Sequence, residues 1–565
     1  MSQEQRTLVA ISLMLGLVII YQAFFAPKRP PEKPVPPPPT AGAQAPQTPK
    51  AAPPPTPPQV GVEAPEHEVR VETPTLSIIL STRGAGVKSW RLKDYVVTGK
   101  GPVDIVAEHP PLVVPPLAAA GYDGMPPSAP YEVDKGSLQL KGKDEEGTVI
   151  FSRKDPDGLR TEKRLRFRGS GYVVAVDLRL SNEGTKDVEV YPKVVWGPGF
   201  YESSEKAGYQ HPPTAWINGD RVEQDPKSIK AGLPKPFDGT PAWAALHDTY
   251  FAAAIIPTSK AATAFVTVTE AHHPWIGLQF PATILHPGQQ TTFLSRAYGG
   301  PKDLDQLASA APGLDRLVDL RFTRYSLGPL GAINYVFEFG LARPALYLLR
   351  FLRSITGSYG LAIILLTILI KVALFPMTQK SLKSMQAMQA LQPKIQAIKE
   401  KYKNNPQKRN QEMAELMRRH KVSGAAGCLP MLAQMPVMIA LYYALSNSID
   451  LWQAPFLWVK DLSAPEHGLF ALPASLPLFG GTEFRPLPLL MGATQFMQMR
   501  ISPSGADPAQ AAMMMYFMPI FMTFIFYGFP SGLVLYWLCF NALQIAQQYL
   551  LNQAQARKKL ATPPA

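Results

Sequence analysis

The sequence predicts an α-helical polytopic membrane protein with six spans, an all-β domain outside the membrane and a helical hairpin in the cytoplasm. Three observations indicate this fold class. The chain of 565 residues has a polar, proline-rich first half and an apolar, methionine-rich second half. Apolar runs in the second half approach the ~20 residues that a helix needs to cross a bilayer. The charged stretches between these runs alternate in sign, as the positive-inside rule requires.

The composition argues against catalytic and metal chemistry. The two cysteines, Cys428 and Cys539, lie in apolar runs and support neither a disulfide framework nor a zinc site. The sequence contains no His-Glu-x-x-His motif and no Gly-x-x-x-x-Gly-Lys-Ser/Thr motif. We therefore expect no catalytic residue, no bound metal and no cofactor.

The first 65 residues predict an anchor and a spacer. Thr7–Phe25 is an apolar run that is too long for a cleaved signal peptide and lacks a good cleavage site. We expect residues 1–26 to be an uncleaved signal anchor. Sixteen of the 39 residues in 27–65 are proline, which is typical of an extended spacer.

Residues 66–324 are expected to form an all-β domain. Short runs alternate between apolar and polar side chains, and glycine-containing turns separate them. The clearest runs are Leu76–Ile78, Val176–Leu180, Val188–Tyr191 and Phe265–Thr269. Strand following strand favours a sandwich of antiparallel sheets, closed by a helix over Asp303–Arg324. A sugar-binding or hydrolytic role of this domain stays open.

Residues 325–355 are expected to contain an amphipathic helix. Three arginines fall near one face, and leucine and phenylalanine side chains fall opposite them. These residues are Arg343, Arg350 and Arg353, against Phe339, Leu346, Leu349 and Leu352. Such a pattern predicts a helix lying in the membrane interface; the alternative is a helix packed on the β domain.

The second span, residues 356–378, contains a lysine inside an apolar run. Lys371 lies near the end of Gly357–Pro376. A lysine within a span costs roughly 2.5–3.5 kcal/mol on insertion scales. It either extends to the nearer headgroups or faces a polar site within the membrane.

Residues 379–424 predict a helical hairpin. Apolar residues recur at helical spacing from Met385 to Tyr402, and a second helical pattern follows the break at Asn404–Pro406. Residues 379–421 hold eleven Lys or Arg against three Asp or Glu, which places the hairpin in the cytoplasm. Its basic surface is either a solvated face or a contact for anionic lipid or ribosomal RNA.

Residues 425–551 hold the last four spans. The apolar runs are Cys428–Leu445, Leu487–Met499, Met513–Tyr527 and Leu533–Leu551. The loop over 448–486 has four acids and two bases, so it is expected outside. The basic tail, residues 552–565, is expected in the cytoplasm.

The last five spans carry many polar groups for their length. They are Lys371, Gln434, Thr494, Gln495, Asn541 and Gln544. Unpaired polar groups facing lipid cost several kcal/mol, so these side chains should line something wet. A transporter would usually show internal repeats and intramembrane acids, and neither is present. The pattern favours a groove for acidic or polar peptide, and the dense methionines are either core filler or an adaptable apolar surface.

The order of parts resembles the YidC/Oxa family of membrane protein insertases in its Gram-negative form. The resemblance covers nearly the whole chain and is strongest from Phe337 to Leu551. The matching motifs are Tyr298–Lys302, Thr367–Lys371, Phe375–Thr378, Leu391–Ile395, Gly427–Pro430, Gln434–Pro436, Ala454–Trp458, Asp461–Ser463 and Phe529–Trp537.

The resemblance implies a multi-pass insertase and foldase of the cell inner membrane, which needs no nucleotide. It implies a five-helix insertase core, a periplasmic super-sandwich domain and a groove that is open to the cytoplasm and closed outside. The implied groove residues are Lys371, Thr367, Gln434, Trp537 and Asn541. The implied face along which a substrate helix slides, on the third and fifth spans, is Met435, Met438, Met518 and Met522.

The resemblance also implies partners. These are nascent membrane proteins, the Sec translocon with its accessory subunits, the ribosome and targeting factors, and the lipid bilayer, with the chain acting as a monomer. The hairpin residues Lys394, Lys399, Lys401 and Arg409 would meet cytoplasmic partners.

Two departures from the family pattern stand out. The family usually has arginine at the groove position, and Lys371 keeps the charge without the bidentate fork. Ser423–Cys428 replaces the family's usual Asn-Pro-Leu-Gly-Gly-Cys. Two other classes stay open: a small-solute transporter or channel, and an envelope enzyme with its activity in residues 60–320.

Overall fold

The computed structural model describes residues 66–561 apart from several short stretches. The stretches left out are 98–100, 107–114, 121–128, 198–213, 218–221, 225–234, 237–239, 260–262, 269–273, 321–333, 421–428, 474–482 and 502–512. The expected signal anchor and proline-rich spacer, residues 1–26 and 27–65, lie outside the described residues.

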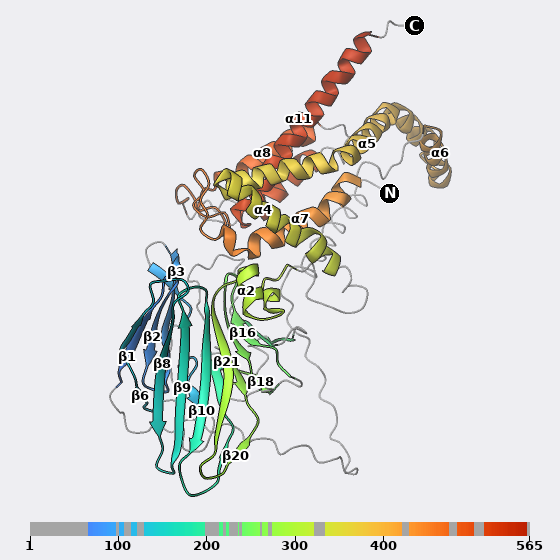
Figure 1. The fold of residues 1–565 in the computed structure, drawn as a ribbon. Coiled ribbons are helices and arrows are strands. Elements are labelled where there is room, and N and C mark those ends of the chain that lie inside the picture. Colours follow the sequence, from blue (N-terminus) through green and yellow to red (C-terminus); the bar gives the residue numbers. More distant parts are fainter. Residues whose placement is uncertain are drawn as a thin grey trace, which may run out of the picture. The chain divides into compact units, whose positions relative to one another are not determined.

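The first described part of the chain is a β domain of four sheets (Figure 1). The nine-stranded sheet has the order β14 (Val222–Gln224), β13 (Thr214–Ile217), β16 (Ala244–His247), β17 (Phe251–Pro257), β21 (Gln290–Pro301), β10 (Val173–Asn182), β9 (Leu159–Arg168), β8 (Glu146–Lys154) and β6 (Glu132–Val133). One five-stranded sheet has the order β4 (Gly101–Asp104), β3 (Gly86–Val97), β2 (Leu76–Ser81), β1 (Glu68–Glu72) and β7 (Ser137–Gln139).

A second five-stranded sheet and a two-stranded ribbon complete the domain. The sheet has the order β15 (Lys235–Pro236), β18 (Thr263–Val268), β19 (Pro274–Gln279), β12 (Lys193–Trp196) and β5 (Ala119–Ala120). The ribbon pairs β11 (Val188–Val190) with β20 (Thr283–Leu285). The four predicted runs overlap β2, β10, β11 and β18, with Thr269 outside the described residues, and the domain is mostly β-sheet as predicted. Among the described pairings only β1 with β7 is parallel.

Large aromatic side chains join the sheets in the domain core. Trp90 and Trp196 are almost fully buried and meet edge to face, with ring centroids 5.5 Å apart. The Trp90 indole N–H donates to the Gly299 carbonyl at 2.9 Å. A Cβ at Gly299 would lie 2.6 Å from the Trp90 ring, so this position needs glycine. The aromatic contacts thus fix β3 of one sheet against β21 of another.

The helix expected over Asp303–Arg324 is shorter in the structure. It comprises α2 (Leu304–Ala310) and the 3₁₀ turn η2 (Leu314–Leu317). Asp303 caps α2 by accepting hydrogen bonds from the backbone N–H groups of Asp305 and Gln306. Gly313, with φ of 77°, then turns the chain in a conformation that a helix cannot continue.

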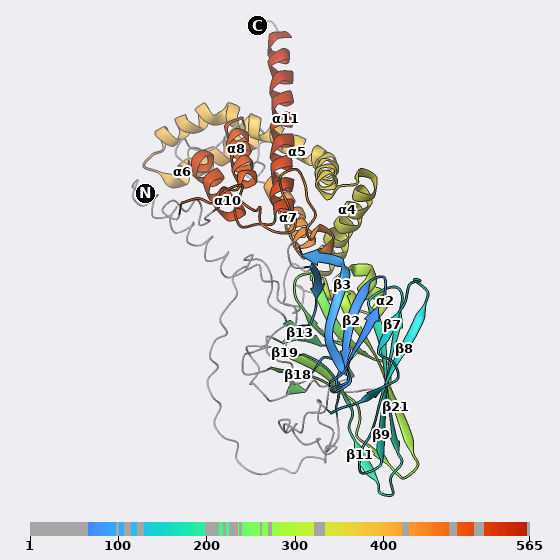
Figure 2. The ribbon, with the colours of Figure 1, turned by 90° about the vertical axis from the view of Figure 1, so that its left-hand side faces the viewer.

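Most of the described residues after η2 are helical. Its elements are η3 (Glu338–Ala342), α4 (Arg343–Thr356), α5 (Tyr359–Lys401), α6 (Pro406–Arg419), α7 (Leu429–Asn447), η5 (Ile449–Leu451), α8 (Pro486–Ile501), η6 (Met513–Phe517), α10 (Met518–Phe526) and α11 (Ser531–Ala561). Figure 2 shows α8 beside both α10 and α11. Of the described helices, α5 alone is long and apolar enough by composition to cross a membrane, over Tyr359–Pro376.

The residues predicted as the second span and as the first arm of the hairpin form one helix. The sequence pattern separates them near Pro376, whereas α5 continues through both Pro376 and Pro393 (Figure 1). The Thr378 hydroxyl donates to the carbonyls of Leu374 and Phe375 at 3.1 and 3.0 Å, and strong helix formers follow. The far end of α5 then packs on α6, where Leu391 and Ile395 are buried against Met413 and Leu416.

The amphipathic helix differs from its prediction in one residue. Leu346, Leu349 and Leu352 are buried together, as expected. Phe339 does not join them: it is 46% exposed, and the Arg343 guanidinium lies 4.6 Å from its ring. The Arg343 side chain is itself only 14% exposed, because its guanidinium also pairs with Asp315 at 2.8 Å and with Glu338 at 3.0 Å.

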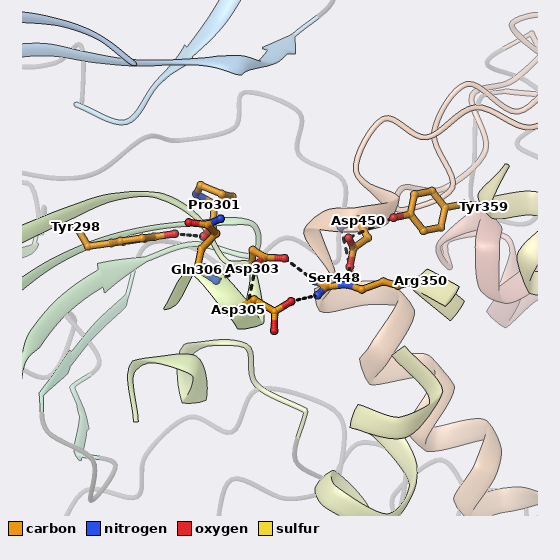
Figure 3. A network of polar contacts seen from close by, with 9 residues as sticks. All are labelled: Tyr298, Pro301, Asp303, Asp305, Gln306, Arg350, Tyr359, Ser448 and Asp450. Atoms are coloured by element: carbon orange, nitrogen blue, oxygen red, sulfur yellow. Dashed lines mark hydrogen bonds and ion pairs between the residues drawn. The ribbon is translucent and has the colours of Figure 1, made fainter. Parts of the chain in front are cut away.

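Arg350 of α4 binds three carboxylates from separate segments (Figure 3). Its nitrogens lie 2.7 Å from Asp450, 2.5 Å from Asp303 and 2.9 Å from Asp305. The Tyr359 hydroxyl donates to the other oxygen of Asp450 at 3.2 Å. Since Asp303 caps α2 and Asp450 lies in η5, one guanidinium connects the end of the β domain, α4 and the loop after α7.

Candidate functional site

The central residue of the candidate site is a lysine enclosed by helices. Lys371 of α5 is 7% exposed. Its ammonium donates to the Gln544 amide oxygen of α11 and lies 4.2 Å from the centroid of the Phe540 ring. Phe540 and Gln544 are four residues apart, so both present the same face of α11. Among the residues described, no carboxylate forms an ion pair with this lysine.

Thr367 lies one turn before Lys371 and is fully buried. Its hydroxyl donates to the Ile363 carbonyl of its own helix at 2.6 Å. This bond satisfies the hydroxyl inside α5. Thr367 therefore lies on the same face of α5 as Lys371, but its hydroxyl proton is already used in the hydrogen bond to Ile363.

Two other expected groove residues connect neighbouring helices. The Asn541 amide of α11 is 3% exposed and makes long contacts with α8, 3.4 Å to the Thr494 hydroxyl and 3.5 Å to the Met491 carbonyl. The Gln434 amide of α7 donates to the Tyr536 hydroxyl of α11. The structure thus places Lys371 and Gln434 against different positions of α11, whereas Asn541 of α11 faces α8.

Several buried polar atoms of the helical part have no hydrogen-bond partner among the described residues. They include the Trp537 indole nitrogen, one amide oxygen each on Gln495 and Gln548, and both amide atoms of Gln547. A buried polar group without a partner costs about 1–3 kcal/mol. Gln547 and Gln548 were missed by the sequence analysis, although amides in an apolar helix are the same signal that identified Gln544. These atoms provide unused hydrogen-bonding capacity inside the bundle.

The methionines expected to guide a substrate helix are not equally accessible. Met435 is 39% exposed on α7, whereas Met438, Met518 and Met522 are half-buried. Met522 packs against the buried core. At least part of this set therefore fills space between helices.

The four basic residues expected on the hairpin lie on both of its helices. Lys394 and Lys401 are exposed, and Lys399 and Arg409 are half-buried. The Lys401 ammonium lies 5.5 Å from the Tyr402 ring. No group of three or more His, Cys, Asp or Glu side chains suited to a metal ion occurs in the part of the chain that the structure describes.

Two protein families match the chain. The family described as 60Kd inner membrane protein matches residues 351–559, and the YidC periplasmic domain matches residues 68–324. A membrane protein insertase YidC from Pelobacter propionicus is 33% identical, covering 97% of this chain and 99% of the relative. The insertase of the same name from Geobacter metallireducens is 35% identical, covering 98% of this chain and 99% of the relative.

Solved structures add little. A galactose mutarotase-like protein from Lactobacillus casei aligns with 41% of this chain and 99% of its own, at 13% identity and a TM-score of 0.28. A likeness this low carries no argument about fold or activity. The two family matches, by contrast, cover both described parts, and the relatives cover almost every residue. The chain therefore belongs to the YidC family of membrane protein insertases.

Proposed function

We propose that this chain inserts proteins into the inner membrane through a polar groove around Lys371. In this proposal the chain has six spans, with the β domain in the periplasm and the hairpin and C-terminus in the cytoplasm. The anchor is the first span, and α5, α7, α8, η6 with α10, and α11 are the other five. The charge alternation of the loops supports this topology.

The groove would lower the barrier that a hydrophilic segment meets in the bilayer. Crossing ~30 Å of hydrocarbon strips such a segment of water. The unpartnered amide oxygens of Gln495 and Gln548 and the amide of Gln547 would offer it hydrogen bonds along the way. Two unit charges 4 Å apart attract by about 4 kcal/mol at the intermediate effective dielectric constant typical near a protein surface. Lys371 can therefore hold an acidic segment while the substrate's apolar helix enters the lipid.

One observation carries this proposal: a lysine, 7% exposed, whose described partners are an amide and an aromatic ring rather than a carboxylate. A buried cation without an opposite charge is expensive. Binding of an acidic peptide segment would explain why a positive charge is present at this position.

The remaining parts of the proposal concern partners. Exposed Met435 suits contact with varied apolar helices. The basic hairpin suits ribosomal RNA, targeting factors or anionic headgroups. The β domain would contact accessory subunits of the Sec translocon, and the insertase would work as a monomer.

The charge of Lys371 can be tested by insertion into liposomes without nucleotide. We expect Lys371→Arg to insert a short, single-span substrate with an acidic translocated tail normally. Lys371→Glu should insert it several-fold more slowly, because two negative charges then repel inside the groove. The matched control is Lys141→Glu, which changes the net charge equally at an exposed position of the β domain.

The substrate provides a second control. A version whose tail is neutral should insert equally with Lys371 and with Lys371→Glu. Equal insertion of the acidic-tailed substrate by both proteins would refute the charge role. Solute flux through vesicles containing the protein would instead support the transporter alternative, although the sequences of α7, α8, α10 and α11 contain no Asp or Glu.

A further inference from the structure

The segment Trp452–Glu466, here called the cap segment, is a compact fold within the loop between α7 and α8. Phe456 and Val459 exchange both backbone hydrogen bonds, at 2.8 and 2.9 Å. The Asp461 carboxylate accepts from the backbone N–H groups of Gln453 and Ser463, at 3.0 and 2.8 Å. The segment therefore has internal order of its own, unlike a loose connection.

The cap segment is bonded to the starts of two helices. The backbone N–H groups of Ser531 and Gly532, which begin α11, donate to the carbonyls of Ala464 and Leu462, each at 2.8 Å. The N–H of Leu487, near the start of α8, donates to the Glu466 carboxylate at 2.8 Å. The first N–H groups of a helix have no partner within it. The cap segment supplies partners to both helices.

Apolar side chains of the cap segment fill the space between these helix ends. Leu462 and Val459 are 0% and 4% exposed. A cavity of about 70 Å³ beside them is lined by apolar residues: Phe456, Leu457, Trp458, Val459, Leu462, Leu487, Leu535 and Leu538. The Phe456 ring covers the backbone of α5 at Gly360, where a Cβ would lie 2.0 Å from the ring. The helices α5, α8 and α11 thus all contact the apolar side chains Phe456, Val459 and Leu462 of the cap segment, here called the apolar plug.

The buried Glu466 fixes one end of this plug. It is 2% exposed and also accepts a hydrogen bond from the Trp458 indole nitrogen at 2.6 Å. Both carboxylate oxygens are thereby used, one by the cap segment itself and one by α8. Burial raises the pKa of Glu466. Its carboxylate lies at the N-terminus of α8, where the helix dipole stabilises negative charge.

We propose that the cap segment is the permeability barrier of the insertase: its apolar plug closes the outer end of the polar groove to water and ions. The proposal deepens the function proposed above and rests on its topology. Gly360 precedes Lys371 by eleven residues, or about 16 Å along the helix. The polar groove and the apolar plug therefore occupy successive levels of the same bundle. Apolar constrictions block ions by excluding water.

Ion leak from vesicles containing the full chain tests the proposal without any substrate. Proton leak is followed with a pH-sensitive dye inside the vesicles, under an imposed pH gradient. We expect Phe456→Ala to raise the leak rate several-fold, because the ring that covers Gly360 is lost. Leu469→Ala is the matched control, since its side chain lies in the same loop, is 59% exposed and does not line this cavity. It should leave the leak at the level of the unchanged protein.

A second variant guards against misfolding of the first. Val459→Cys, in a chain with Cys428 and Cys539 changed to serine, keeps a small side chain in the plug. Attaching a bulky charged thiol reagent from the outer side should then open the leak several-fold. A tight vesicle after complete modification, or an unchanged leak in folded Phe456→Ala, would overturn the proposal.

The result can be separated from the groove proposal. Lys371→Glu should insert acidic-tailed substrates poorly and still hold the gradient, because the plug is intact. A leak in Lys371→Glu equal to that of Phe456→Ala would show that the barrier is not in the cap segment.

Discussion

Lys163 of the β domain and Lys371 of the helical bundle are both buried, and the two lysines have different partners. Lys163 of β9 is 1% exposed, and its ammonium donates to the backbone carbonyls of Ala85 and Leu117. Lys371 of α5 is 7% exposed and contacts a side-chain amide and an aromatic ring. Ala85 and Leu117 lie in turns of the backbone, so their carbonyls are held by the chain itself, whereas the Gln544 amide is at the end of a side chain with rotatable bonds.

This difference suggests a structural role for Lys163 and, in the groove proposal, a substrate-binding role for Lys371. Lys163 completes the hydrogen bonding of a tight turn, in which Gly84 and Ala85 both have positive φ. Removing it would leave fixed acceptors unpaired. In the proposed groove, the Gln544 side-chain amide would turn away and an incoming carboxylate would replace it beside Lys371. Whether a buried lysine has a structural role thus depends more on the kind of acceptor, backbone carbonyl or side chain, than on how deeply the lysine is buried.

The largest expected effect is on the stability of the β domain. Lys163→Ala should lower its free energy of unfolding by about 3–5 kcal/mol, because it leaves a cavity and two unpaired carbonyls. Lys163→Met, which keeps the volume, should recover part of the loss. Hydrogen exchange of the β9 and β10 amides in the full-length protein measures both. A loss below about 1 kcal/mol for Lys163→Ala would contradict the structural role.

The pH dependence of stability should be the next largest effect. Burial lowers the pKa of Lys163 to about 7 from its ordinary value of 10.5. Between these values the unfolded chain binds a proton that the folded chain does not, so stability rises with pH. The slope should approach about 1.4 kcal/mol per pH unit from pH 7 to 10, and it should vanish in Lys163→Met. The same hydrogen-exchange measurement at three pH values checks it.

Lys371→Met should have the smallest effect on stability and a clear effect on function. Replacing a poorly paired buried charge by an apolar side chain of similar length should change stability by less than about 1 kcal/mol. Insertion of acidic-tailed substrates should fall several-fold, and insertion of neutral-tailed ones should not. Thermal unfolding in detergent and liposome insertion measure the two effects. A large loss of stability with normal insertion would make Lys371 a structural residue like Lys163.

The two lysines also differ in how far the sequence could predict them. Lys371 stands out because it is charged within an apolar run. Lys163 lies among charged residues of β9, Leu159–Arg168. Period-two alternation nevertheless places it inward with Leu159, Leu165 and Phe167, whose side chains are buried. The sequence analysis did not consider Lys163, and the phase of the strand is the signal that could have identified it, because residue type alone would place a lysine outside.

Features that depend on distant contacts were beyond the sequence. The alternating runs predicted β2, β10, β11 and β18, since one face of each strand is buried. The continuity of α5 through Pro376 was not predicted, because one lost hydrogen bond does not decide between a kink and an end. The triple pairing of Arg350 was also hidden, since Asp303, Asp305 and Asp450 come from segments that only the fold brings together.

Thiol labelling at position 371 tests the central claim most directly. The full chain carries Lys371→Cys, with Cys428 and Cys539 changed to serine, and inverted membrane vesicles expose its cytoplasmic side. Lys394→Cys on the exposed hairpin is the positive control. A membrane-impermeant maleimide should label position 371 from the cytoplasmic side and not from the periplasmic side. No labelling at position 371 from either side, with full labelling of the control, would show a dry interior and contradict the groove.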